Sequence, residues 1–128
     1  MNVRTMRAGV IGLGVGERHV TGYGQIADCE VTAICDRDPV KLAEVGDRQG
    51  IACRETDWRK IVGHPDIDLV SICSYDDTHT EQAVAAFGNG KHVMIEKPIA
   101  LNRREAEAIL RAQQDSGCLI TSNFILRQ

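Results

Sequence analysis

Three glycines stand close together where a first apolar run gives way to a polar one. The stretch "VIGLGVGERH" places Gly12, Gly14 and Gly16 directly after an expected strand at residues 7–12. Glycines at such a turn let backbone amides approach a pyrophosphate at the N-terminus of the next helix, where N–H groups and the helix dipole favour anions. We therefore expect these glycines and Val15 to form a phosphate-binding loop.

The loop departs from the G-x-G-x-x-G pattern in one respect. Glu17 occupies the position of the last glycine, and Gly16 comes one place early, so the loop is about one residue shorter than the usual form. The shorter loop leaves its phosphate contacts open. Glycines also mark ordinary strand-to-helix turns, so a turn without any ligand is the alternative interpretation.

An acid at the end of the second expected strand strengthens the first interpretation. Asp36 ends "CEVTAICD" at residues 29–36. An acid at this place accepts hydrogen bonds from ribose hydroxyls and repels a 2′-phosphate, although aspartate also favours turns such as the one before Asp38–Pro39. Arg37 fits three roles: pairing with a 2′-phosphate, stacking on adenine, or contact with solvent. The order of strand, loop, helix, strand and acid predicts a dinucleotide site that prefers NAD to NADP.

Polar residues also follow the fourth and fifth expected strands, at 66–74 and 91–96. The carboxyl ends of parallel strands meet at one edge of a sheet, where ligands bind. We expect five residues to gather there beside the nicotinamide end of the cofactor: Ser74, Tyr75, His79, Glu96 and Lys97. A lysine at this place can donate to a substrate hydroxyl or carbonyl, so Lys97 is the catalytic candidate. His79 fits equally well as a histidine that opens a helix and packs on the sheet.

These residues need a scaffold, and the chain alternates short β-branched runs with helical patterns. We expect strands at 7–12, 29–36, 50–53, 66–74, 91–96 and 118–124, with helices between them. Near-continuous apolar strands are typical of a sheet that is covered on both faces. The pattern predicts an α/β, doubly wound Rossmann fold with about six mostly parallel strands, spanning residues 1–128 as one domain.

Composition restricts the partners. The net charge of −3 over 128 residues gives no basic patch for nucleic acid or an anionic membrane, and no apolar run approaches the roughly 20 residues that span a bilayer. The five cysteines are widely spaced without a C-x-x-C pair. We therefore expect free thiols, no metal site and a cytoplasmic location.

Several segments together resemble the glucose-fructose oxidoreductase / inositol dehydrogenase / rhizopine catabolism (Gfo/Idh/MocA) family over essentially the whole chain. They are "GLGVGERH", the aspartate ending "VTAICD", "THTEQAVAAFGNGKHVMIEKPIALN" and "SNFILR". The resemblance implies that Lys97 lies beside nicotinamide and substrate and assists hydride transfer, while Glu96 places the turn. Family members often have Thr-Pro after the fourth strand, where this chain has Ser74-Tyr75, so the contacts to the nicotinamide ribose stay open.

The resemblance further implies an NAD(P)-dependent oxidoreductase that acts on a secondary alcohol or ketone of a sugar, cyclitol or related polyol. Members carry a second, larger α/β domain with further catalytic residues, and no segment of this sequence corresponds to it. We therefore expect an N-terminal domain that binds dinucleotide, turns over little substrate alone, and oligomerises only with the second domain. The alternatives are a stand-alone dinucleotide-binding or sensing module, and a scaffold that has lost its ligand.

Overall fold

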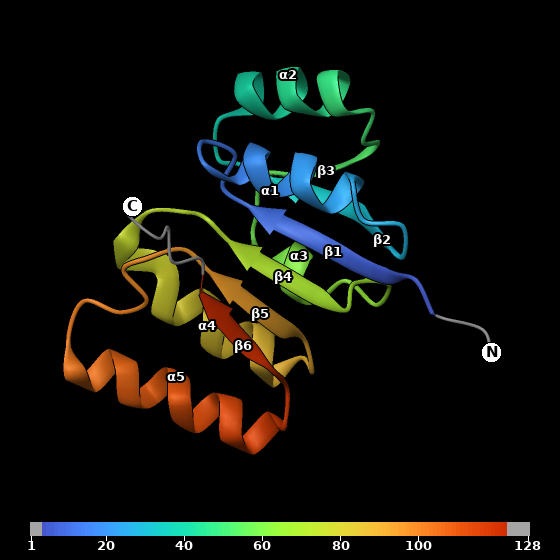
Figure 1. The fold of residues 1–128 in the computed structure, drawn as a ribbon. Coiled ribbons are helices and arrows are strands. Elements are labelled where there is room, and N and C mark those ends of the chain that lie inside the picture. The colour runs from blue at the N-terminus through green and yellow to red at the C-terminus, as the bar shows by residue number, and fades with distance from the viewer. Residues whose placement is uncertain (1–3, 123–128) are drawn as a thin grey trace, which may run out of the picture.

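A single parallel sheet organises the chain, and the computed structural model describes residues 4–122 of it (Figure 1). Six strands pair in the order β3-β2-β1-β4-β5-β6, and every pairing is parallel. The strands are β1 (Met6–Ile11), β2 (Cys29–Cys35), β3 (Cys53–Glu55), β4 (Leu69–Ile72), β5 (His92–Ile95) and β6 (Ile120–Ser122). This order reverses between β1 and β4, as in a doubly wound Rossmann fold, so the predicted fold class is confirmed.

Helices cover both faces of the sheet (Figure 1). They are α1 (Gly16–Gly24), α2 (Pro39–Gln49), α3 (Arg59–Val62), α4 (His79–Gly88) and α5 (Arg103–Ser116), with a 3-10 turn η1 (Asp76–Thr78) before α4. Side chains of α1 and α2 pack in one buried cluster with Val10 and Ile34. Those of α3, α4 and α5 pack in a second cluster with Val70 and Ile95. None of the helices in the described part of the chain is long and apolar enough to cross a bilayer.

Several expected strand boundaries differ from the structure. The third strand was expected at 50–53, but β3 begins at Cys53, because Gly50 ends α2 in the left-handed region at φ 70° and Ile51 N–H still bonds to the Gly46 carbonyl. The last strand was expected to reach residue 124, and its final two positions lie outside the described residues. β1 begins at Met6, one residue before the strand expected at 7–12, whereas the strands expected at 29–36, 66–74 and 91–96 contain β2, β4 and β5.

Side-chain caps set the starts of the two longest helices. Asp38 accepts hydrogen bonds from the backbone N–H of Val40 (2.9 Å) and precedes Pro39, the first residue of α2. Asn102 accepts from Glu105 N–H at 2.9 Å and begins α5. Capping of this kind satisfies donors that the first helical turn leaves without partners. The cap at Asp38 also fixes the turn that follows β2, next to Asp36.

Candidate functional site

The three loop glycines do three different things. Gly12 has φ +89°, and a Cβ there would lie 2.6 Å from the Cys73 carbonyl oxygen, so only glycine fits this turn. Gly16 lies against the sheet, where a Cβ would lie 3.0 Å from Val10 Cγ1. Gly14 has no atom within 4 Å of its Cβ position and faces open space. The loop therefore holds a tight turn, an open approach and a close helix–sheet contact, the three tasks of glycine in a dinucleotide loop.

The same loop leads into an N-terminus without a side-chain cap. Val15 is the N-cap of α1 and makes no side-chain hydrogen bond to it. The first N–H groups of a helix lack partners within the helix and carry the positive end of its dipole. The start of α1 is therefore suited to an anion.

A pocket of about 330 Å³ opens at the carboxyl edge of the sheet, beside this loop. Its walls include seven of the predicted residues: Gly12, Gly14, Val15, Asp36, Arg37, Ser74 and Tyr75. Four others, Gly16, His79, Glu96 and Lys97, are outside that lining. Leu13, Lys41, Trp58, Cys73 and Gln82 also line the pocket and were not predicted as site residues. They come from separate elements of the fold, so no single sequence motif groups them.

Asp36 joins the end of β2 to the glycine loop. Its Oδ2 accepts a hydrogen bond from Leu13 N–H at 2.8 Å, and its Oδ1 accepts one from Asp38 N–H at 2.8 Å. A carboxylate offers about four acceptor positions, so these two bonds leave room for hydroxyl donors from a ligand. The turn role and the ligand role of Asp36 are therefore compatible.

Glu17 faces away from the pocket and toward α2. Its carboxylate accepts hydrogen bonds from Arg48 Nε (2.7 Å) and Nη2 (2.9 Å), and from Gln49 Nε2 (3.1 Å). The hydrogen bonds from Arg48, then from Gln49, lower the pKa of Glu17 to about 2. The residue that stands where the usual pattern has glycine therefore ties α1 to α2.

Arg37 and Tyr75 meet across the mouth of the pocket. The guanidinium carbon of Arg37 lies 5.3 Å from the centre of the Tyr75 ring, within the range of a cation–π contact. Tyr75 is 70% exposed, so this contact is at the surface. Behind it, the Ser74 hydroxyl donates to Gln82 Oε1 at 2.5 Å.

His79 is buried beneath the pocket rather than exposed in it. It is the first residue of α4, as expected, and only 1% of its surface is exposed. Its Nδ1 lies 2.9 Å from the Pro98 carbonyl oxygen and its Nε2 lies 2.9 Å from the Ser74 carbonyl oxygen. His79 thus links the turn after β4 to the turn that contains Lys97, whose side chain is exposed and whose bond to Pro98 is cis.

Glu96 belongs to a group of buried polar residues that the sequence did not reveal. Its Oε1 lies 2.6 Å from His19 Nε2, on α1. Donor atoms of His19, Glu96 and Cys73 all lie within 4.8 Å of one another. Because the His19 ring already pairs with Glu96 and with Ser71, we interpret His19 and Glu96 as members of a hydrogen-bond network, beside the Cys73 thiol, whose pKa is raised by burial.

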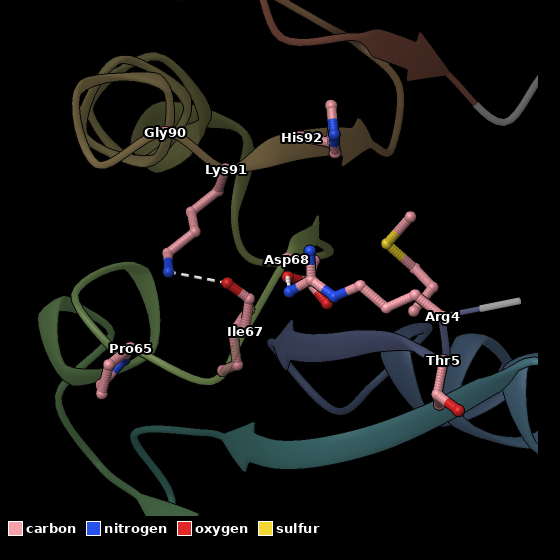
Figure 2. Close-up of a pocket in the computed structure, with 9 residues that line it drawn as sticks. Arg4, Thr5, Pro65, Ile67, Asp68, Gly90, Lys91 and His92 are labelled. Atoms are coloured by element: carbon pink, nitrogen blue, oxygen red, sulfur yellow. Dashed lines mark hydrogen bonds and ion pairs between the residues drawn. The ribbon is translucent and has the colours of Figure 1, made fainter. Parts of the chain in front are cut away.

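A second pocket, of about 340 Å³, opens at the opposite edge of the sheet (Figure 2). Lys91 reaches into its wall, where Nζ donates to the backbone carbonyls of His64 (2.6 Å) and Ile67 (2.7 Å). Asp68 accepts from Arg4 Nη2 at 2.6 Å and from Arg7 N–H at 3.0 Å. The charged groups of this pocket are already bonded to backbone carbonyls or to one another, which indicates a structural role.

Comparison with known proteins gives one family match. The model of the Gfo/Idh/MocA family, described as an oxidoreductase family with an NAD-binding Rossmann fold, matches residues 6–124. A 4-carboxy-2-hydroxymuconate-6-semialdehyde dehydrogenase from Sphingobium sp. is 34% identical over 90% of this chain and 38% of its own length. The myo-inositol 2-dehydrogenase of Thermotoga maritima is 31% identical over 93% of this chain and 36% of its own length.

A solved structure agrees with these matches. The scyllo-inositol dehydrogenase of Lactobacillus casei, with bound cofactor NAD(H) and scyllo-inositol, superposes with a TM-score of 0.87 at 29% identity, over 94% of this chain and 36% of that one. The chain therefore spans somewhat more than a third of the length of the relatives that it matches.

Proposed function

The chain belongs to the Gfo/Idh/MocA oxidoreductase family, and from this premise we propose that it is the dinucleotide-binding domain of an oxidoreductase that prefers NAD to NADP. The observation that carries the proposal is the open approach at Gly14, beside the start of α1. A pyrophosphate would lie against this backbone, held by N–H groups of the loop and the first turn of the helix. Gly12 and Gly16 would shape the loop without contacting the ligand through side chains.

Asp36 would select the adenosine ribose. Its two oxygens lie in the pocket wall and keep acceptor capacity for the ribose hydroxyls, while its charge would repel a 2′-phosphate. Lys41 and Arg37 line the same pocket and carry the opposite charge. We expect the carboxylate to outweigh them, because hydroxyl donors at Asp36 would bond to it directly whereas Arg37 is engaged with Tyr75.

Lys97 would act at the other end of the ligand. When bound, the nicotinamide supplies the chemistry, accepting or donating a hydride at its ring. The ammonium of Lys97 would orient a substrate oxygen and take part in its proton transfer. Glu96 and His79 would place the turn that carries Lys97, since one is bonded to α1 and the other to the Pro98 carbonyl.

For the substrate, we propose a secondary alcohol or the corresponding ketone on a sugar, cyclitol or related polyol. The Thermotoga relative is a myo-inositol dehydrogenase and the Lactobacillus structure contains scyllo-inositol, which supports a ring hydroxyl. The Sphingobium relative is a semialdehyde dehydrogenase, so assays should also include aldehydes. All five cysteines are free thiols, which supports a reducing compartment, and we propose the cytoplasm.

Calorimetric titration of the chain with NADH and with NADPH tests the proposal. We expect saturable binding with NADH bound more tightly. Asp36→Asn keeps an oxygen for Leu13 N–H but loses the charge, so it should weaken NADH binding and narrow the gap between the two cofactors. Asp47→Asn, an exposed carboxylate paired with Arg54 at 2.9 Å, is the matched control and should change neither affinity. Failure of the unmodified chain to bind either cofactor would contradict the proposal.

A further inference from the structure

Four buried or half-buried side chains form a continuous chain of hydrogen bonds between α1 and the turn after β5. Tyr23 Oη lies 2.5 Å from Ser71 Oγ, Ser71 Oγ lies 3.2 Å from His19 Nδ1, and His19 Nε2 lies 2.6 Å from Glu96 Oε1. His19 and Tyr23 are each 8% exposed, and Ser71 on β4 is fully buried. We call these residues the His19 network.

The chemistry of the groups fixes which atom donates at each step. A carboxylate at Glu96 only accepts, so His19 Nε2 carries the proton of that bond. In a neutral imidazole Nδ1 then accepts, and the Ser71 hydroxyl donates to it. The Ser71 oxygen in turn accepts from the Tyr23 hydroxyl. One neutral tautomer of His19 therefore gives every contact of the network a donor and an acceptor.

The network joins the two ends of the proposed site. His19 lies one helical turn beyond Gly16, the first residue of the helix whose N-terminus faces the pocket. Glu96 immediately precedes Lys97. A short bond between His19 and Glu96 thus connects the element that would hold the pyrophosphate with the turn that would hold the reacting substrate oxygen.

We propose that His19 is a positioning residue that couples dinucleotide binding at the glycine loop to the placement of Lys97. The inference rests on the proposed function, because it requires a ligand at the start of α1. A ligand seated there fixes α1, and the His19–Glu96 bond passes that position to the neighbouring Lys97. Coupling between two sites is reciprocal, so breaking the bond also weakens binding of the dinucleotide.

Two amide substitutions separate the two bonds of the ring. The amide of His19→Gln reaches the position of Nε2 and can still donate to Glu96. The shorter amide of His19→Asn reaches only the position of Nδ1, so it keeps the contact with Ser71 and loses Glu96. We expect His19→Asn to bind NADH about 5-fold or more weakly and His19→Gln to stay within about 2-fold of the unmodified chain. Circular dichroism checks that both variants fold.

Nuclear magnetic resonance gives a readout that a purely structural role would not change. In the unmodified chain and in His19→Gln, NADH should shift the backbone amides of Glu96 and Lys97 to the same extent. In His19→Asn at saturating NADH, these shifts should be reduced while those of the glycine loop remain. Equal affinity and equal shifts in all three proteins would overturn the coupling and leave the proposed function standing.

Two further outcomes are decisive without any variant. His19 Nε2 should carry a proton, because the Glu96 carboxylate only accepts, and a bare Nε2 would overturn the network even if His19→Asn failed to fold. A chain that folds but binds no dinucleotide would contradict the proposed function, and the coupling with it.

Discussion

The two edges of the sheet carry pockets of nearly equal volume and opposite character. At the carboxyl edge, about 330 Å³ opens beside Gly14, which has open space at its Cβ position, and beside a helix start without a side-chain cap. At the amino edge, about 340 Å³ opens beside Lys91 and Asp68, whose charged groups are already bonded to the protein. Volume alone therefore does not identify the functional pocket.

What separates the two pockets is where the donors point. Two of the three N–H donors of Lys91 bond to backbone carbonyls, and Asp68 is bonded to Arg4 and to the Arg7 backbone. In contrast, α1 begins without a side-chain cap for its first N–H groups, of which Arg18 N–H bonds to the Val15 carbonyl. A ligand would gain hydrogen bonds at the carboxyl edge, whereas at the amino edge it would have to displace existing ones.

The largest expected effect is on stability, at the amino edge. Lys91→Met should lower the free energy of unfolding by about 3 kcal/mol, because it leaves the carbonyls of His64 and Ile67 without their charged donor. The melting temperature of the variant should fall, but at temperatures where the variant is folded it should still bind NADH. Urea unfolding measures the first effect, and calorimetry measures the second.

Lys60→Met is the matched control for that experiment. Lys60 is 68% exposed and lies 3.8 Å from Glu55, so its loss should cost less than about 0.5 kcal/mol. If Lys91→Met were as stable as the control, or if it lost NADH binding while folded, the structural role of the amino edge would be wrong.

A smaller effect is expected at the carboxyl edge, on NADH affinity rather than on stability. Gly14→Ala meets no atom within 4 Å and should fold with nearly unchanged stability, but its methyl group stands where a pyrophosphate would approach. We expect NADH affinity to fall about 10-fold, which corresponds to about 1.4 kcal/mol. Gly22→Ala, also in open space but on α1, should leave affinity unchanged. Equal binding by both variants would place the ligand elsewhere.

The smallest expected effect concerns Glu17, between the two helices of one face. Because its pKa is lowered from 4.5 to about 2, its contribution to stability is present above pH 4.5 and is lost as pH falls toward 2. Glu17→Gln should cost at most about 1 kcal/mol at pH 7, since the partner Arg48 is 57% exposed. Urea unfolding at pH 7 and pH 3 measures the change.

Glu107→Gln is the control, because Glu107 pairs with the 91% exposed Arg103 and should contribute less. The difference between the unmodified chain and Glu17→Gln should shrink at pH 3. A difference that grew on acidification would contradict the assigned direction of the pKa.

Most of the fold was predictable because its signals are local. The apolar runs that became β1, β2, β4 and β5 and the cap at Asp38 depend on neighbouring residues only. The third strand was misplaced because "GIAC" has strand-forming residues while Gly50 ends the preceding helix. No local pattern shows that the helix C-cap takes precedence there over strand propensity.

The pocket was predictable where a motif marks it and hidden where side chains meet across the sheet. Gly12, Gly14 and Asp36 belong to a recognisable order of strand, glycine loop and acid, and all three line the pocket. Ser71 lies 52 residues from His19 and 48 residues from Tyr23 in the sequence, and only the packing of α1 on β4 brings them together. An alternation of polar residues on a helix carries no sign of such a partner.

The two hydrogen bonds that Asp36 accepts from the backbone have a consequence for how cofactor preference could evolve. Any replacement at residue 36 that removes its oxygens would also release Leu13 N–H and loosen the glycine loop. A change from the proposed preference for NAD to one for NADP would therefore be costly in a single step at this residue. It would proceed more readily through Arg37 and Lys41, which line the same pocket and are not bonded to the loop among the described contacts.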